Sequence, residues 1–196
     1  ASGDRGHTQT PWLNSRHTFS FGSYYDPRYL GFSDLRVIND DVVAPAEGFG
    51  THPHKNMEIV TIVLDGELEH RDSMGSRGVI KAGEIQKMSA GSGITHSEMN
   101  PSLSKPVHFL QIWIEPNIDD VKPEYMQAAP SPQELKSRLV RIASPKSTDS
   151  PITLHQNAEI YQTQPEQDKT VSFDITPAHK VWIHVATGAV SLDGHP

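Results

Sequence analysis

The chain has 196 residues and a formal net charge of −7, from 17 Lys and Arg against 24 Asp and Glu. This acidic balance argues against a duplex-DNA-binding protein, which needs a basic surface to displace counterions. Cysteine is absent, which excludes a disulfide framework, a thiolate zinc site and a cysteine nucleophile. No apolar run approaches the roughly 18 residues that a membrane span needs. Reactive chemistry therefore depends on the carboxylates and the 11 histidines.

Short apolar stretches, bounded by turn residues, are typical of an all-β sandwich or barrel. In the first part of the chain we expect strands at Leu35–Ile38, Ile59–Leu64, Val79–Ile80, Ile85–Met88 and Val107–Ile114. Asp65 and Gly66 predict a hairpin between Val63 and Leu68, because this pair suits the two positive φ angles of a type I′ turn.

The second part of the chain continues the same pattern. Strands are expected at Leu139–Ile142, Ile152–Leu154, Ile160–Tyr161, Val171–Ile175, Val181–Val185 and Val190–Leu192. The only helical pattern is at Ser131–Arg138, with Ser131 as the N-cap and Pro132 at the first helical position.

A domain boundary is predicted near Pro116–Ala129, where a polar, proline-containing stretch follows a long apolar strand. Residues 59–68 and 181–190 share one pattern, an apolar strand, a glycine turn and a second strand. We therefore expect two β-barrel domains, 1–116 and 117–196, the second of them incomplete at its C-terminus.

Two pairs of polar residues carry the chemistry that the sequence suggests. His52 and His54 are two positions apart, and so are His96 and Glu98. Side chains at i and i+2 of a strand share one face, so three imidazoles and one carboxylate converge if the two strands face each other across a barrel. Such a set suits a divalent first-row metal and leaves two positions of an octahedral shell open. A His-x-His pair alone is more often a surface feature; the joint arrangement favours a metal.

The spacing of these residues resembles two known motifs. Gly50-x-His52-x-His54-x3-Glu58-x7-Gly66 is similar to the first cupin motif. Gly83-x5-Ser89-x-Gly91-x-Gly93-x2-His96-x3-Asn100 is similar to the second, with Gly91 where many cupins have proline. The stretches 51–54, 69–75 and 93–98 resemble pirin-like bicupins more closely, in particular the bacterial pirin-like quercetin 2,3-dioxygenases, and the resemblance covers nearly the whole chain.

The resemblance implies a ligand set and a fold. The metal ligands would be His52, His54, His96 and Glu98, and the fold would be an all-β bicupin of two jelly-roll-like barrels. Glu58, a ligand in many other cupins, would contact the ligands without binding the ion, or would be purely structural. The second barrel would lack a metal site. One divalent transition metal ion is implied, with iron favoured and with zinc, manganese, cobalt, nickel and copper as alternatives.

Four apolar residues flank the motifs and are candidates for the lining of a substrate pocket, although core packing is the simpler interpretation of each: Phe21, Phe49, Met57 and Met88. His70 and His108 lie on predicted strands and are expected to be wall or core residues.

The implied activity is a dioxygenase that opens the central ring of flavonols such as quercetin with O2 and releases carbon monoxide. Glu98 would be the catalytic base that takes the flavonol proton, with Glu58 as the lesser candidate. One alternative is a metal-dependent regulatory protein that binds other proteins, as pirin-type transcription co-regulators do; another is a dioxygenase with a different substrate. We expect a cytoplasmic monomer that binds neither nucleic acid directly nor membranes.

Overall fold

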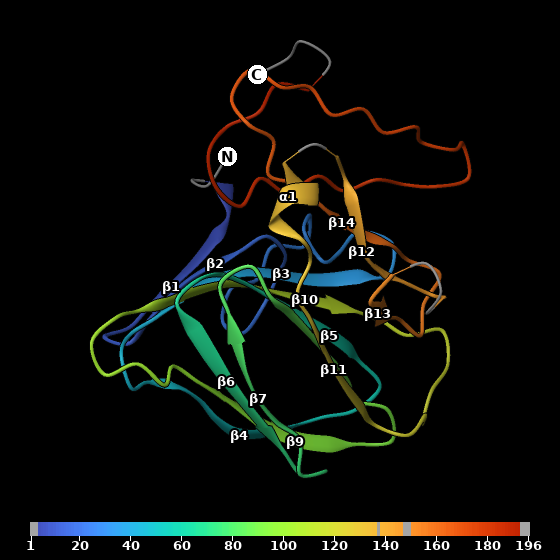
Figure 1. The fold of residues 1–196 in the computed structure, drawn as a ribbon. Helices are drawn as coiled ribbons and strands as arrows, with labels where there is room; N and C mark the ends of the chain where they lie inside the picture. The colour runs from blue at the N-terminus through green and yellow to red at the C-terminus, as the bar shows by residue number, and fades with distance from the viewer. Residues whose placement is uncertain (1–3, 137, 147–149, 193–196) are drawn as a thin grey trace.

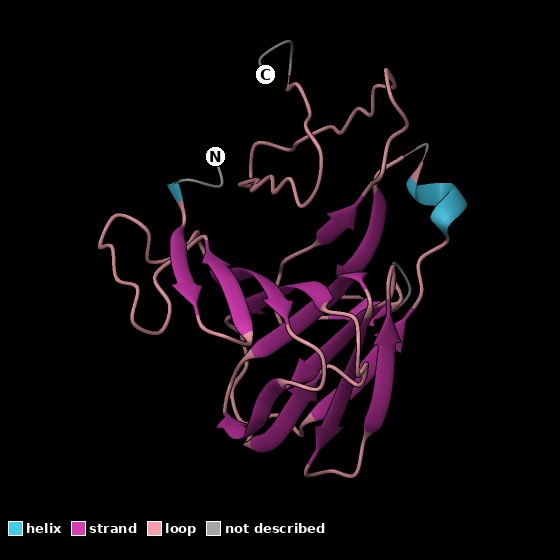
Figure 2. Ribbon diagram, turned by 90° about the vertical axis from the view of Figure 1, so that its left-hand side faces the viewer, coloured by secondary structure: helices cyan, strands magenta, loops and turns pink. Residues whose placement is uncertain are grey.

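Strands dominate the computed structural model, which describes residues 4–136, 138–146 and 150–192 (Figures 1 and 2). A seven-stranded sheet has the order β1-β2-β3-β10-β5-β8-β11. Its strands are β1 (Gly6–Gln9), β2 (Leu13–His17), β3 (Leu35–Val43), β5 (Glu58–Asp65), β8 (Ile85–Ser89), β10 (Val107–Ile114) and β11 (Glu124–Ala128). All of the strands expected before residue 115 are present.

A four-stranded sheet of order β4-β9-β6-β7 lies against one face of the seven-stranded sheet (Figure 1). Its strands are β4 (Gly48–His54), β6 (Glu67–Asp72), β7 (Arg77–Lys81) and β9 (Ile94–Met99). The C-terminal region lies on the other side and contains a three-stranded sheet of order β13-β12-β14. It comprises helix α1 (Pro132–Leu135), β12 (Val140–Ser144), β13 (Ile152–Thr153) and β14 (Ile160–Gln162).

The seven-stranded sheet is buried on both faces, which explains the near-continuous apolar runs of its central strands. On β10, Leu110 and Ile112 belong to the largest apolar cluster, together with Ile142 and Ile152 of the C-terminal region. Phe109 alternates with them and packs in a second cluster against strands of the four-stranded sheet. Each face therefore has its own apolar partner, and the C-terminal region covers the back of the barrel.

The predicted hairpin at Asp65 and Gly66 is wrong. β5 already pairs with β10 on one edge and β8 on the other, so no edge is left for β6. The chain instead turns a corner into the four-stranded sheet. Only Gly66 of the two residues has a positive φ, at 79°, and a Cβ there would lie 2.7 Å from the carbonyl oxygen of Pro106. The glycine is required for this corner and not for a type I′ turn.

The prediction also differs from the structure in the last part of the chain. The stretches expected at Val171–Ile175, Val181–Val185 and Val190–Leu192 form none of the described strands. A strand needs a neighbouring strand for its backbone donors and acceptors, and the apolar side chains here remain exposed, Ile183 by 54%. The helix is shorter than expected, and Ser131 is its N-cap without a side-chain hydrogen bond.

β11 lies beyond the predicted domain boundary at residue 116 and yet extends the seven-stranded sheet by pairing with β8. No helix in the described ranges is long and apolar enough to cross a membrane.

Two charged groups are buried behind the barrel, on the face of the seven-stranded sheet that the C-terminal region covers. The Lys87 side chain is fully buried, and its Nζ lies 3.5 Å from Glu58 Oε2 and 3.5 Å from Glu124 Oε2. Glu58, itself 1% exposed, also accepts a hydrogen bond of 3.2 Å from the backbone N–H of His155. Glu58 thus joins β5 to the C-terminal region and neutralises a buried cation.

We predict that Glu58→Gln lowers the free energy of unfolding by about 3 kcal/mol, because it leaves the buried ammonium of Lys87 with one carboxylate partner, the half-exposed Glu124. Urea unfolding followed by circular dichroism measures the loss. The double variant Glu58→Gln/Lys87→Met is the control and recovers stability, because it removes both charges. Equal stability of Glu58→Gln and the unmodified protein would contradict this role.

A second buried carboxyl, that of Asp41, destabilises the folded protein at neutral pH. Burial raises the pKa of Asp41 to about 7, from a usual value of 3.8. The folded state therefore prefers the protonated form, so this group's contribution to stability is complete below the usual pKa and is lost as the pH rises toward 7. The neighbouring Asp40 behaves oppositely: burial raises its pKa, but His108 and Arg5 outweigh burial and hold the pKa below its usual value.

We expect Asp41→Asn to raise the Tm near pH 8 by about 2–4 °C for each kcal/mol recovered, and to change it little near pH 4. Asp40→Asn, the matched control, should lower the Tm near pH 8. Thermal unfolding at both pH values measures these differences, and a shift for Asp41→Asn that is the same at both would rule out the explanation.

Candidate metal centre

The pairing of β4 with β9 brings the predicted histidines together. The two strands are antiparallel neighbours, and His52 lies directly opposite His96. His54, two residues after His52, shares its face of the strand. The sequence-based expectation that these strands face each other across the barrel is therefore corrected: the histidines meet side by side within one sheet.

The three imidazoles form a compact group. Their ring centroids are separated by 4.8 Å for His52 and His54, 4.5 Å for His52 and His96, and 4.9 Å for His54 and His96. One nitrogen from each ring lies within 4.8 Å of the others. His52 donates its Nδ1 hydrogen to the carbonyl oxygen of Gly50 at 2.7 Å, which leaves its Nε2 lone pair free. An ion among these rings would therefore meet Nε2 of His52.

The electrostatics of this group suit a metal ion. Burial lowers the pKa of His54 to about 4, and burial together with the neighbouring histidines lowers that of His96 to about 2. The rings of His54 and His96 are neutral at physiological pH, which is the form that binds metal. His96 is 1% exposed, and neither of its ring nitrogens has a hydrogen-bond partner. Buried polar atoms are rarely unpaired, so the nitrogens of His96 call for a partner. A transition metal ion that binds imidazole nitrogens fits the group.

Glu98 lies in the barrel interior, held by three side chains of the seven-stranded sheet. Its Oε1 accepts hydrogen bonds from Gln86 Nε2 at 2.7 Å and Thr61 Oγ1 at 3.3 Å, and its Oε2 accepts one from Gln111 Nε2 at 2.6 Å. Burial nevertheless raises the pKa of Glu98 to about 7. Among the described residues, one carboxylate oxygen of Glu98 lies within 4.8 Å of a ring nitrogen of His96 and of one of His70. The histidines His52, His54 and His96 form a separate group. No single group contains all four predicted ligands, and His96 belongs to both.

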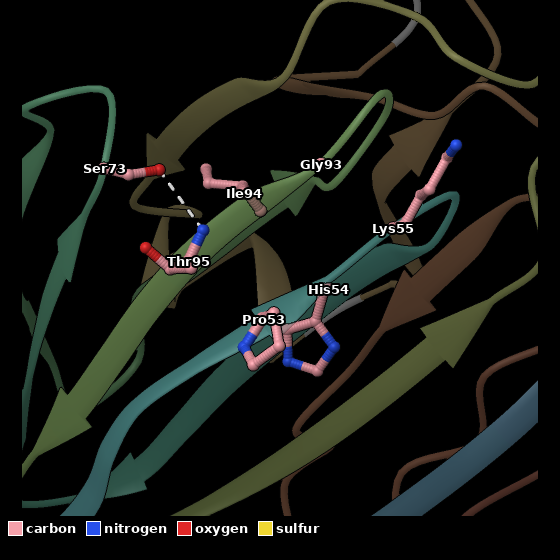
Figure 3. A pocket seen from close by; sticks show the side chains of 7 residues that line it. All are labelled: Pro53, His54, Lys55, Ser73, Gly93, Ile94 and Thr95. Atoms are coloured by element: carbon pink, nitrogen blue, oxygen red, sulfur yellow. Dashed lines mark hydrogen bonds between the residues drawn. The ribbon is translucent and has the colours of Figure 1, made fainter.

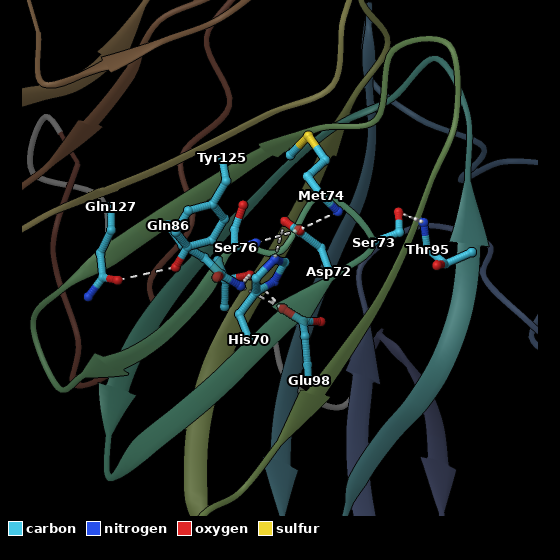
Figure 4. Close-up of polar contacts among 11 residues, drawn as sticks. His70, Asp72, Ser73, Met74, Ser76, Gln86, Thr95, Glu98, Tyr125 and Gln127 are labelled. Atoms are coloured by element: carbon cyan, nitrogen blue, oxygen red, sulfur yellow. Dashed lines mark hydrogen bonds and ion pairs between the residues drawn. The ribbon is translucent and has the colours of Figure 1, made fainter.

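His70 belongs to the site, although the sequence predicts for it a position in the barrel wall or core. It lies on β6 opposite Glu98 of β9, is fully buried, and stacks on Tyr125 with a centroid separation of 4.5 Å (Figure 4). A signal for it was present, because Leu68, His70 and Asp72 alternate with charged residues along this strand. That alternation predicts an inward-facing histidine.

Aromatic rings form one wall beside the histidines. Trp113 of β10 meets His54 edge to face at 4.9 Å, and Phe21 meets Trp113 in the same way at 5.4 Å. The indole Nε1 of Trp113 is buried and has no partner. Phe21, predicted as a pocket residue, is therefore close to the site through Trp113.

The other predicted pocket residues lie in apolar clusters. Met57 and Met88 pack with Trp113, and Met88 is only 1% exposed. Phe49 packs edge to face on Trp12 at 5.3 Å. These positions are consistent with the simpler interpretation as core residues.

A hollow of about 590 Å³ adjoins His54 (Figure 3). It is lined by Pro53, His54, Lys55, Ser73, Gly93, Ile94 and Thr95, and by none of the four predicted pocket residues. Pro53 and Thr95 are register partners that alternate with the inward-facing His52 and His96. The inward-facing pair of His54 and Ile94 also lines the hollow, which therefore lies at the end of the β4–β9 pairing.

Glu58 is not in contact with the histidines. It alternates with Ile59 and Thr61 on β5, and Thr61 is the residue that reaches Glu98. Glu58 instead meets Lys87 and the backbone of His155 on the opposite face. This placement agrees with the purely structural alternative for Glu58 and separates it from the barrel interior.

Comparison with known proteins identifies the family of this chain. The model of the Pirin family matches residues 2–114, and that of the quercetinase C-terminal cupin domain matches residues 141–196. The Escherichia coli (strain K12) protein named quercetin 2,3-dioxygenase is 47% identical over 191 residues, covering 97% of this chain and 81% of the relative. A putative quercetin 2,3-dioxygenase of Mycobacterium tuberculosis (strain ATCC 25618 / H37Rv) is 45% identical over 193 residues, 97% of this chain and 78% of the relative.

Solved structures give the same result. The crystal structure of YhhW from Escherichia coli matches with a TM-score of 0.79 and 49% identity, over 82% of this chain and 68% of that one. The structure of the bacterial pirin YhhW in complex with nickel(II) matches with a TM-score of 0.77 at the same identity and coverage. With more than half of its length matched by the family model and relatives of this similarity, the chain belongs to the pirin family.

Proposed function

We propose that this protein is a metal-dependent dioxygenase that opens the central ring of flavonols such as quercetin with O2 and releases carbon monoxide. The observation that carries the proposal is the compact group of three imidazoles, one of them buried with both nitrogens unpaired, beside a carboxylate held by amides. The names of the relatives support the substrate class, since two of them are called quercetin 2,3-dioxygenase or its putative equivalent.

The ion would be held by His52, His54 and His96, with Glu98 reaching it from the same strand as His96. A divalent transition metal supplies Lewis acidity, which lowers the pKa of a bound hydroxyl group. Iron is our first choice, and zinc, manganese, cobalt, nickel and copper are the alternatives. The nickel(II) complex of the related pirin supports a transition metal in this fold. Affinity follows the metal's place in the Irving–Williams series, so the ion that copurifies need not be the one that supports turnover.

The chain's own residues perform three tasks in this reaction. Glu98 accepts the proton of the flavonol 3-hydroxyl group, and the amides of Gln86 and Gln111 hold its two oxygens in place before and after the transfer. Trp113 presents an aromatic ring beside His54, and Phe21 packs against Trp113; both rings suit the planar rings of a flavonol. The buried walls exclude water from the reactive flavonolate and so limit side reactions.

Replacement of a ligand should abolish metal loading. We predict that His52→Ala and His96→Ala each lower the metal content after reconstitution to background, because each removes one of the three nitrogens that lie within 4.8 Å of one another. Inductively coupled plasma mass spectrometry on the desalted protein measures the content. His108→Ala is the control, since His108 pairs with Asp40 at a distance of 2.7 Å and does not belong to this group. Retained metal and activity in His96→Ala would refute the ligand assignment.

The proposed base is tested by Glu98→Gln. This variant keeps the volume of the side chain and should reduce kcat for quercetin by about 100-fold or more, with a far smaller effect on Tm. Quercetin consumption and carbon monoxide release are followed together on protein reconstituted separately with Fe, Mn, Co, Ni, Cu and Zn, with metal content measured in each sample. Turnover equal to that of the unmodified protein would exclude Glu98 as the base. No turnover with any of these metals would favour the regulatory alternative.

A further inference from the structure

His70 is held in one orientation by two contacts. Its Nε2 lies 3.1 Å from Asp72 Oδ2, and its ring stacks on Tyr125 with an interplanar angle of 25° (Figure 4). Asp72 is itself fixed, since its Oδ1 accepts hydrogen bonds from the backbone N–H groups of Met74 at 2.9 Å and Ser76 at 3.0 Å. The side chains of His70 and Asp72 are both fully buried.

The contact with Asp72 determines which nitrogen of His70 carries the hydrogen. A carboxylate only accepts, so the neutral imidazole has its hydrogen on Nε2 and a bare lone pair on Nδ1. Nδ1 is buried and has no hydrogen-bond partner. His70 therefore presents an unused acceptor to the interior of the barrel.

His96 requires a hydrogen-bond acceptor for one of its ring nitrogens. A metal ion takes one of its two nitrogens, and the other then carries a hydrogen that needs an acceptor, because His96 is buried. The oxygens of Glu98 already accept three hydrogen bonds from the seven-stranded sheet. His70 Nδ1 accepts none, and the centroids of His70 and His96 are 5.4 Å apart. The χ2 torsion of a histidine has a broad energy well, so a small rotation of His96 suffices to pair them.

We propose that His70 is a positioning residue for the metal ligand His96: it accepts the ring N–H of His96 that faces away from the ion and forms a chain Asp72–His70–His96. The inference rests on the proposed metal centre but not on the proposed reaction. The chain orients the His96 ring and makes its metal-binding nitrogen more electron-rich, as a carboxylate does when it contacts a ligand histidine directly. The competing interpretation is that His70 is itself a ligand, in a group with His96 and Glu98.

Metal affinity of matched variants tests the proposal. His70→Asn keeps a carbonyl acceptor at the position of Nδ1, whereas His70→Leu fills the space without one. We expect the Kd for Co(II), measured by competition with a chelator, to rise about 10–100-fold in His70→Leu and to stay within about threefold of the unmodified value in His70→Asn. Asp72→Asn should also weaken binding, because its amide can donate to Nε2 and move the ring hydrogen to Nδ1. His108→Asn, at the other histidine–aspartate pair, should change nothing.

Two spectroscopic readouts separate positioning from ligation. Two-bond ¹H–¹⁵N correlations of the imidazoles should show the Nε2–H form of His70 in the apo protein and in the Zn(II) protein, and the Nδ1–H form in Asp72→Asn. X-ray absorption of the Co(II) protein should count the same nitrogen ligands in His70→Asn as in the unmodified chain. Loss of one nitrogen would make His70 a ligand and overturn the proposal.

Equal Co(II) affinity of His70→Leu and the unmodified chain would also overturn it, and so would an unmodified chain that binds no metal. A chain that binds metal as expected but does not consume quercetin would refute the proposed function alone.

Discussion

The register of β9 within the four-stranded sheet determines where the polar side chains of the site lie. Pairing with β4 sets His52 opposite His96, and pairing with β6 sets His70 opposite Glu98. Side chains alternate along a strand, so a slip of one residue would turn these groups outward and bring Thr95 inward. The candidate metal centre therefore depends on strand pairing and not on a loop.

The seven-stranded sheet supplies the opposite wall and separates two kinds of buried polar group. Gln86 points into the barrel and holds Glu98, while the next residue, Lys87, points out of the back and meets Glu58. The polar groups of the interior thus bind a carboxylate, and those behind it join the barrel to the C-terminal region. One sheet serves both purposes because its two faces alternate along every strand.

The fold class and the three histidines could be predicted from the sequence because their signals are local: short apolar stretches and an i, i+2 spacing. Strand pairing depends on distant parts of the chain, which is why the neighbour relation of β4 and β9 was not predictable. The turn residue Gly66 was recognised correctly, but only the occupied edges of β5 show that no hairpin forms there. The face of Glu58 was equally hidden, because both faces of β5 are buried and its apolar run has no alternation.

The corner at Gly66 also determines how the two sheets are joined. There the chain passes between the sheets in one residue, packed against the carbonyl oxygen of Pro106, so the walls that carry Thr61 and His70 are tethered covalently on that side. At one end of the four-stranded sheet, β4, the strand of His52 and His54, has β9 as its one neighbour among the described strands. Two of the three histidines are therefore held in place through the strand that carries the third.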